Sequence, residues 1–401
     1  MTPAAVEQLA SLAAARLEKT LSADAMRHNL ATMREAAAGR RIMAVVKGDA
    51  YGLGAPAVAG VLVAAGADAL AVDTVAEGAE LRERGIEAPI LVMDVDVTDT
   101  ATACARHRLM PAVATVEQVR RHATVARRQG APVTVWLRAN IGFNRFGPRE
   151  EREFAAVLGA LSETRAAVRP AGMFAHLSSS DQDRKETIEQ VGTFRSRLTL
   201  ARAALGPQLQ ASLAATHGLL HPEALRGTGW VRPGIGLYGL LRSGSVEEAG
   251  AADTKMSRLR PAITVRARVL DLLSVTRPEG IGYVRSAVVP PGRRLASVAI
   301  GFSRGITGTA PAFSGLLRGR SCAMVGRPGM DCTQFDVTDV PAARPGDWMT
   351  FIGRDPDGNG PRRTAQDAGR ELGLSLYELL ATLRMPVRLE DQAAPLTPQV
   401  R

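Results

Sequence analysis

The sequence predicts an α/β protein, a (β/α)8 TIM-like barrel with a second, mostly β C-terminal domain. Short apolar strands and amphipathic helical segments alternate as roughly eight units before residue 241. The character then changes, because β-like runs dominate the rest of the chain. A length of 401 residues suits a barrel with one further domain. A doubly wound sheet is the alternative, which the number and even spacing of the units disfavour.

The first element is a helix expected over residues 22–38. Ser22 is a suitable N-cap, and Met26, Leu30 and Met33 follow it at helical spacing. The barrel strands are expected as short apolar runs at 42–46, 69–72, 89–93, 110–114, 133–138, 171–177, 211–216 and 234–238. Helices are expected between them, over segments that include 75–84, 116–128, 149–161 and 186–205.

The second domain begins after a stretch of polar and small residues at 241–257, which indicates a linker. We expect residues 21–245 to form the barrel, and residues 1–20 with 246–401 to form the mostly β domain. In the latter, strands are expected at 263–273, 294–299, 319–325 and 348–352, a loop at 355–363, and helices at 364–372 and 376–383.

Composition narrows the class of protein. The formal net charge is +10, but the arginines are scattered and aromatic residues make up only 4%, so stacking surfaces for nucleic acid are scarce. No apolar run approaches a membrane span, and Met1–Leu21 lacks the pattern of a signal peptide. The three cysteines show neither metal-site nor disulfide spacing, which is typical of a cytoplasmic protein. We expect no metal, nucleic-acid or membrane partner.

Lys47 is the most informative single residue. It follows the first apolar run, precedes a Gly/Asp/Tyr turn, and is one of only four lysines in an arginine-rich chain. In a barrel, the chemistry lies at the C-terminal ends of the strands. A primary amine there can lose its proton and form a Schiff base, which a guanidinium cannot. The alternative is a lysine that only extends from a strand end into solvent.

The segment Arg232–Gly239 supplies a second part of the site. Its three glycines formally match a dinucleotide fingerprint, but no βαβ unit and no suitably placed acidic residue follow. Barrel enzymes often bind phosphate with the loops after strands seven and eight. Gly234, Ile235 and His217 are therefore candidates for a phosphate site, the alternative being a tight closure of the barrel.

A lysine and a phosphate cradle at one barrel mouth predict pyridoxal 5'-phosphate as the cofactor. Arg232 would face the pyridine nitrogen and, because an arginine keeps its proton, would leave that nitrogen unprotonated. The cofactor would then be a weaker electron sink, which suits racemisation better than transamination. His176 ends the sixth expected strand and is either a hydrogen-bonded core residue or a polar group of the mouth.

The chain resembles the alanine racemases, which are fold-type III pyridoxal-phosphate enzymes, from about residue 18 to the C-terminus. Val45–Gly52 with Gly54 resembles their cofactor-lysine motif, and Val231–Ile235 with residues 237–239 resembles their pyridine-nitrogen and phosphate loop. Further matches lie at Glu279–Tyr283, Val325–Arg327, Met330–Asp331 and Leu376–Glu378. The resemblance implies a racemase that interconverts L- and D-alanine.

The resemblance also implies a two-base mechanism. Lys47 would hold the cofactor and act as one base, while Tyr283 would act as the opposite base from the second subunit of an obligate head-to-tail homodimer. The backbone at Met330 would hold the substrate carboxylate across the same interface. Cations such as His176 and Arg232 would help a tyrosine act as a base.

Three further residues take their roles from the resemblance alone. Arg145 matches the arginine that contacts the phenolic oxygen of the cofactor and the carboxylate of the substrate. Tyr51 and Tyr377 match the tyrosines that bind the phosphate. The second domain would thus contribute to the active site of the dimer partner.

The chain departs from the family pattern at four places. Arg138 stands where many members have a lysine, and it would support Arg145 as a permanent cation. Thr216-His217 replaces Asn-Ser, Gly301–Gly305 reads Gly-Phe-Ser-Arg-Gly in place of Gly-Tyr-Ala-Asp-Gly, and Pro328-Gly329 replaces Val-Cys. These departures leave two alternatives open. One is a divergent enzyme that acts on another amino acid by racemisation, decarboxylation or retro-aldol cleavage, and the other is a non-catalytic pyridoxal-phosphate protein.

Overall fold

A computed structural model describes residues 16–94, 100–242, 255–307, 313–356 and 361–391. The chain divides into two compact units, one of Ala25–Arg260 and one of Met1–Asp24 with Pro261–Arg401. Most of the expected linker at 241–257 and part of the expected loop at 355–363 lie outside the described residues. What is described of the linker ends in a short 3-10 helix, η3 (Lys255–Arg258).

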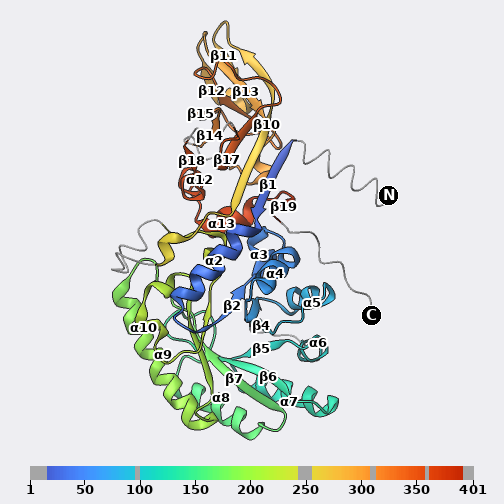
Figure 1. Cartoon of the computed structure of the whole chain (residues 1–401), viewed down its shortest axis with the longest axis vertical. Helices are drawn as coiled ribbons and strands as arrows, with labels where there is room; N and C mark the ends of the chain where they lie inside the picture. The colour runs from blue at the N-terminus through green and yellow to red at the C-terminus, as the bar shows by residue number, and fades with distance from the viewer. Residues whose placement is uncertain (1–15, 95–99, 243–254, 308–312, 357–360, 392–401) are drawn as a thin grey trace. The chain divides into compact units, whose positions relative to one another are not determined.

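Eight parallel strands close into a barrel in the first unit, as predicted (Figure 1). The ring closes where β9 pairs with β2, with Trp230 opposite Arg41. The strands are β2 (Arg41–Val45), β3 (Ala69–Val72), β4 (Ile90–Val92), β5 (Met110–Val113), β6 (Val133–Arg138), β7 (Val168–Phe174), β8 (Gln210–Ala215) and β9 (Trp230–Arg232).

The eighth strand was predicted at the wrong place. The strand is β9 at Trp230–Arg232, whereas the expected run at 234–238 forms a 3-10 helix, η2 (Ile235–Tyr238). Pro233 interrupts the run because it has no backbone N–H for a ladder. The backbone N–H groups of Gly234 and Gly236 then turn to a side-chain acceptor in place of a neighbouring strand.

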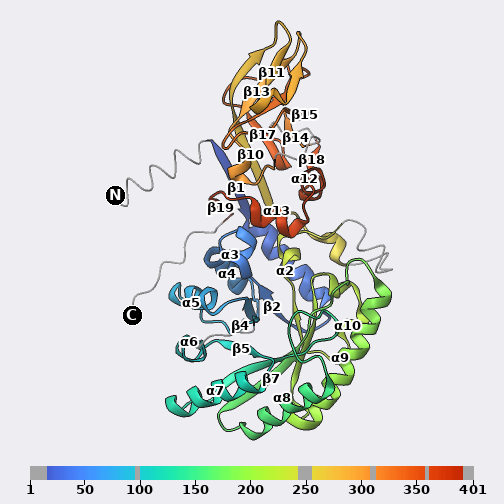
Figure 2. The same ribbon diagram turned by 180° about the vertical axis from the view of Figure 1, so that it is seen from behind.

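Helices alternate with these strands and lie outside the ring, which Figure 2 shows for α5 to α9. Capping boxes fix where two of them begin, since Thr74 and Thr115 each accept a hydrogen bond from the third residue of the helix that follows. The helices are α2 (Ala23–Ala36), α3 (Lys47–Gly52), α4 (Ala55–Ala64), α5 (Val75–Glu83), α6 (Ala101–Arg106), α7 (Val116–Gln129), α8 (Glu151–Glu163), α9 (Arg184–Leu205) and α10 (Pro222–Leu225), with η1 (His217–Leu220) as a 3-10 turn.

Ser22 was expected to cap the first helix, but it is the last residue of a strand, β1 (Leu17–Ser22). Its hydroxyl donates to Asp391 Oδ2 at 3.0 Å. The strand pairs with β10 (Ile263–Ser274), and its residues Lys19, Thr20 and Leu21 are buried, so tertiary pairing decides this local structure.

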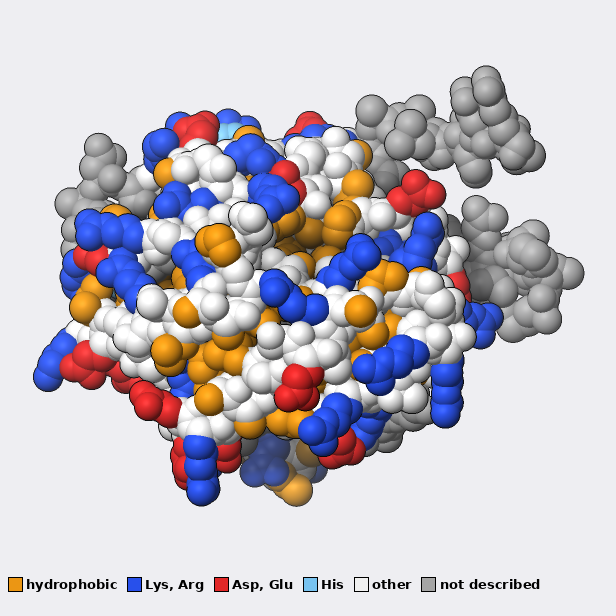
Figure 3. All heavy atoms as spheres, turned by 90° about the horizontal axis from the view of Figure 1, so that it is seen from below, with side chains coloured by type: hydrophobic (Ala, Val, Ile, Leu, Met, Phe, Trp, Pro, Cys, Tyr) orange, Lys and Arg blue, Asp and Glu red, His pale blue; other side chains and the backbone are white. Residues whose placement is uncertain are grey.

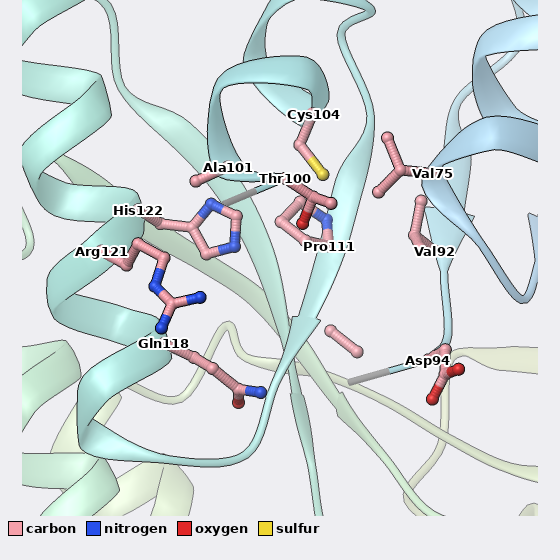
Figure 4. Close-up of a pocket in the computed structure, with 11 residues that line it drawn as sticks. Val75, Val92, Asp94, Thr100, Ala101, Cys104, Pro111, Gln118, Arg121 and His122 are labelled. Atoms are coloured by element: carbon pink, nitrogen blue, oxygen red, sulfur yellow. The ribbon is translucent and has the colours of Figure 1, made fainter. Parts of the chain in front are cut away.

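Small and large side chains share the inside of the barrel. Alanines such as Ala69 and Ala112 pack there beside Trp136 and Trp230. Gly172 gives Trp136 its space, since a Cβ at that glycine would lie 2.5 Å from the indole ring. Between α6, α7 and the strands beside them lies an enclosed cavity of about 20 Å³, into which Cys104 and His122 point (Figure 4). It has room for one water molecule.

The second unit is mostly β, as predicted. Its nine-stranded sheet runs in the order β18-β17-β14-β15-β16-β13-β10-β1-β19 (Figure 1). β1, from the N-terminal part of the chain, therefore lies between β10 and β19, the last strand of the chain. The strands are β10 (Ile263–Ser274), β13 (Arg294–Val298), β14 (Ser314–Leu317), β15 (Arg320–Val325), β16 (Thr333–Asp336), β17 (Trp348–Arg354), β18 (Arg362–Arg363) and β19 (Val387–Glu390).

A separate hairpin and two helices complete this unit. The hairpin consists of β11 (Glu279–Ile281) and β12 (Ala287–Val289), and the helices are α12 (Ala365–Leu372) and α13 (Leu376–Thr382). In the part of the chain described here, no helix is long and apolar enough to cross a bilayer. Basic side chains are scattered over the face shown in Figure 3, with acidic ones between them.

Candidate active site

Lys47 lies two residues beyond β2, at the C-terminal end of that strand. Its Nζ donates to Oδ2 of Asp73 at 3.2 Å, and Asp73 directly follows the neighbouring strand β3. The two side chains are 32% and 42% exposed. The amine is therefore oriented by a carboxylate and still open to a ligand at the barrel mouth.

The residues after Lys47 form a left-handed turn. From Gly48 to Tyr51 every φ lies between 53° and 62°, a conformation that costs L-residues about 1–2 kcal/mol each. Asp49 secures the turn, because its Oδ1 accepts a hydrogen bond from Ala55 N at 2.7 Å. The turn brings Tyr51 to the glycine loop, where a Cβ at Gly234 would lie 2.1 Å from the tyrosine Oη. Strain of this kind concentrates at functional sites.

Thr216 supports the glycine loop that follows β9. The Thr216 Oγ1 accepts hydrogen bonds from Gly234 N at 3.0 Å and from Gly236 N at 3.2 Å. A Cβ at Gly236 would lie 2.7 Å from Thr216 Cγ2, so only glycine allows this approach. Ile235, between the two glycines, is buried. The loop thus presents closely packed backbone beside Tyr51, which suits a bound anion.

His217 was expected to contact the same anion, and the structure gives its ring another partner. The His217 Nε2 accepts a hydrogen bond from Arg242 N at 3.1 Å. The side chain of Arg242 forms an ion pair with Asp181 at 3.3 Å. Burial lowers the pKa of His217, so the ring is neutral and can accept this bond. Its role in binding the cofactor stays a prediction.

His176 lies at the centre of the cationic side chains of the mouth. Desolvation of the ring, followed by the charges of Arg232, Arg145, Lys47 and Arg138, together lower its pKa to about 3, although the residue stays exposed at the mouth. These four side chains therefore lie close enough to the ring to act on its charge. The expectation that His176 is itself a cation is wrong for this structure, because its ring is neutral at neutral pH.

Arg145 projects from a loop after β6 that Asn140 shapes. The Asn140 Oδ1 accepts hydrogen bonds from Gly142 N at 3.0 Å and Asn144 N at 3.2 Å. The Arg145 guanidinium stacks 4.4 Å from the ring centroid of Phe143. No ion pair to Arg145 is formed among the described residues, so its charge is available to a substrate or cofactor anion.

Arg138 and Arg232 lie deeper and are both buried. Arg138 donates to Met93 O and lies 4.5 Å from the centroid of Phe146, and burial with the charge of Arg145 lowers its pKa to about 10. Arg232 donates to Ser212 Oγ at 2.6 Å, and burial followed by the charge of Arg138 lowers its pKa to about 9. Both remain cations at neutral pH.

Tyr283, Met330 and Tyr377 belong to the second unit. Tyr283 is 66% exposed at the tip of the β11–β12 hairpin, and Met330 is 57% exposed. A Cβ at Gly329 would lie 4.0 Å from Tyr283 Cε2, so the hairpin tip and the loop of Met330 are neighbours. Tyr377 lies in α13 and is 44% exposed.

Two residues of the barrel mouth were missed by the sequence reasoning. Thr216 was noted only as a strand end and as a departure from the family pattern, yet its Oγ1 accepts hydrogen bonds from both glycine N–H groups. Tyr238 is fully buried, its ring meets that of Tyr51 edge-on at 5.7 Å, and its Oη has no hydrogen-bond partner among the described residues. The sequence did carry a signal for each residue. Thr216 is a hydroxyl residue directly after a barrel strand, and Tyr238 is a tyrosine within the glycine segment.

The chain matches two family models, which are described as the N-terminal and C-terminal domains of alanine racemase, over residues 21–242 and 262–390. The chain belongs to the alanine racemase family. An alanine racemase of Syntrophobacter fumaroxidans is 33% identical to it, with 90% of this chain and 93% of that protein covered. An alanine racemase of Nitratidesulfovibrio vulgaris is 34% identical, with 91% and 95% covered.

Solved alanine racemase structures have the same fold. A structure from Streptomyces lavendulae superposes with a TM-score of 0.86 at 26% identity, covering 94% of this chain and 97% of that chain. Family membership, the barrel with a mostly β domain, and the class of enzyme, a racemase, are thereby confirmed.

Proposed function

We propose that the chain interconverts L- and D-alanine with pyridoxal phosphate held by Lys47. The observation that carries this proposal is the position of Lys47 beyond the C-terminal end of β2, where its Nζ donates to Asp73 at 3.2 Å and the side chain stays 32% exposed. Alanine is the substrate named for the curated relatives.

The residues at the mouth fit this cofactor. Its phosphate is an anion, and the loop at Gly234 offers close-packed backbone beside Tyr51. The buried Tyr238 Oη, which has no partner among the described residues, supplies a further donor. When bound, pyridoxal phosphate supplies a carbonyl carbon for the amine and an electron-withdrawing ring for the α-carbon of the substrate.

In this proposal each side chain has a separate task. Lys47 Nζ binds the cofactor and moves the α-proton on one face. Arg232 keeps its proton and so remains a donor toward the cofactor ring. Arg145 binds the carboxylate of the substrate, and the neutral His176 can share a hydrogen bond without adding charge.

The second base is proposed to be Tyr283 of another copy of this chain, in a head-to-tail homodimer. Tyr283 and Met330 are neighbours and exposed, which supports a role for both at a shared site. On this proposal the mostly β domain of each subunit serves the partner's barrel. Cys104, Cys322 and Cys332 form no disulfide among the described residues, which supports a cytoplasmic location.

The test is exchange of the α-hydrogen in deuterated water across a panel of L- and D-amino acids. Both enantiomers of alanine should exchange fastest, and a faster amino acid would assign the chain another substrate. Lys47→Ala should remove both the visible absorption of the bound cofactor and the exchange. Tyr283→Phe should keep that absorption and block exchange for one enantiomer far more than for the other. Equal slowing of both would remove Tyr283 as the second base.

A further inference from the structure

A cavity of about 340 Å³ opens at the N-terminal ends of the barrel strands. Arg41, the first residue of β2, and Trp230, the first residue of β9, line it. Lys47 lies beyond the other end of β2, so this cavity is separate from the proposed active site. Its volume is in the range of small-molecule sites.

Two tryptophans form the apolar wall of this cavity. Trp136 and Trp230 meet edge-to-face, with ring centroids 6.2 Å apart, and are only 2% and 7% exposed. Met110 and Ala171 line the cavity beside them, and the small Ala171 leaves the space open. The indole N–H of each tryptophan has no hydrogen-bond partner among the described residues. Buried polar groups are rarely left without one.

The polar end of the cavity is cationic. The Arg41 guanidinium lies 4.1 Å above the Trp230 ring, and its Nη2 donates to the neutral Oε1 of Gln210 at 3.1 Å. Asp68, the acidic residue of the lining, is already engaged by Arg34 at 2.9 Å and by Ile42 N at 2.8 Å. Among the described residues, Arg41 therefore has no carboxylate partner.

We propose that this cavity binds a small aromatic carboxylic acid. The ring of the ligand would pack against Trp136, Trp230 and Met110, and its carboxylate would bind the guanidinium of Arg41. Arginine suits this task because its planar fork binds both oxygens of a carboxylate. A ligand with an aromatic ring and an ammonium group would meet repulsion from the same guanidinium. This binding site goes beyond the racemase reaction and does not depend on it.

Benzoate is the probe, with benzyl alcohol as its uncharged counterpart, and both are titrated into the holoenzyme. The readout is the ¹H–¹⁵N resonance of each indole N–H, assigned with single Trp→Phe variants. The chain has three tryptophans, and the third, Trp348, lies in the other unit under Arg268 at 3.8 Å. Benzoate should shift the Trp136 and Trp230 resonances saturably and leave Trp348 unchanged. Benzyl alcohol should bind at least about tenfold more weakly.

Three variants locate the binding. Arg41→Gln should weaken benzoate about tenfold or more and leave benzyl alcohol unchanged, whereas Arg41→Lys should keep part of the affinity. Ala171→Leu should fill the cavity and abolish both. Arg145→Ala, at the opposite mouth, should change neither.

The proposal is overturned by any of four results. These are the absence of a saturable shift with benzoate, equal shifts of all three indoles, an unchanged affinity in Arg41→Gln, or loss of benzoate binding in Arg145→Ala. The last result would assign the benzoate to the cationic mouth around Lys47. Because racemase activity is not the readout, failure here leaves the proposed function standing.

Discussion

The charges at the barrel mouth act most directly on one residue, His176. Desolvation of the ring and four nearby cations lower its pKa to about 3, far below its usual 6.5, although the residue is exposed at the mouth. The folded chain therefore binds the proton less readily than the unfolded chain. The stabilisation from the neutral ring is fully present above pH 6.5 and is lost as the pH falls from there toward 3.

This shift predicts how stability changes with pH in the cofactor-free protein. Between pH 7 and pH 5, His176 should lower the free energy of unfolding, and by less than a fully buried ring would, because the residue is exposed to solvent. Urea unfolding of the wild type and of His176→Asn at both pH values measures this loss, and the variant should lose less stability than the wild type. Equal losses in the two proteins would show that the ring is not neutral in the folded state.

Thr216 makes a second prediction for a single residue. Thr216→Val removes the acceptor of two buried N–H groups, so the cofactor-free protein should lose about 2–4 kcal/mol of stability. Bound phosphate can accept from the same loop, so the loss should shrink when pyridoxal phosphate is present. Thr216→Ser, which keeps the hydroxyl, is the matched control. Chemical unfolding with and without cofactor measures the loss of stability in each case. An equal loss with and without cofactor would contradict the idea that Thr216 and the phosphate accept hydrogen bonds from the same loop.

At the scale of the element, the glycine loop should tolerate no side chain. In Gly234→Ala the new Cβ would lie 2.1 Å from Tyr51 Oη, so the tyrosine must move. The affinity for pyridoxal phosphate should fall at least about tenfold, as measured by titration of the cofactor absorption. Gly60→Ala in α4 is the control, because nothing lies within 4 Å of its Cβ. It should leave the affinity unchanged and add about 0.5–1 kcal/mol of stability.

Barrel strands could be located from sequence wherever a run of buried residues stands between turn signals. β9 could not, because it has only three residues and the following glycine segment is equally apolar. The short strands β14 and β16 were missed for a related reason, since four residues carry too little periodicity. These two strands form because they pair with strands distant in the sequence, and a local sequence pattern does not show such pairing.

The residues of the candidate site also divide into those that the sequence could predict and those that it could not. Lys47 and Gly234 could be proposed for the site because each lies in a short motif with its own chemistry, whereas Arg145 was proposed from the family resemblance alone. The support that Thr216 gives the loop could not, because it joins residues 18 positions apart through a side chain. The neutral state of His176 depends on desolvation of the ring and on cations from several strands, so only the assembled barrel reveals it.

For the whole molecule, the proposed dimer predicts complementation between two inactive variants. In a mixed dimer of Lys47→Ala and Tyr283→Phe, one site would combine the intact lysine of one subunit with the intact tyrosine of the other. Random exchange of subunits should restore about a quarter of wild-type activity, since half of the dimers are mixed and each has one working site.

Racemase assays before and after unfolding and refolding of the mixture measure this recovery. The control mixes the double variant with Tyr283→Phe, a pair that contains no complete site. If Tyr283 served its own subunit, the first mixture would also stay inactive.

The left-handed turn after Lys47 makes position 48 suitable for a D-amino acid. Gly48 has φ 60° and ψ 46°, which are the angles that a D-residue prefers. D-Alanine introduced there by protein ligation should be more stable than L-alanine at the same place by about 1–2 kcal/mol. Thermal unfolding of the two ligated proteins measures the difference. The backbone beside the proposed catalytic lysine would then discriminate between the two enantiomers that the proposed reaction interconverts.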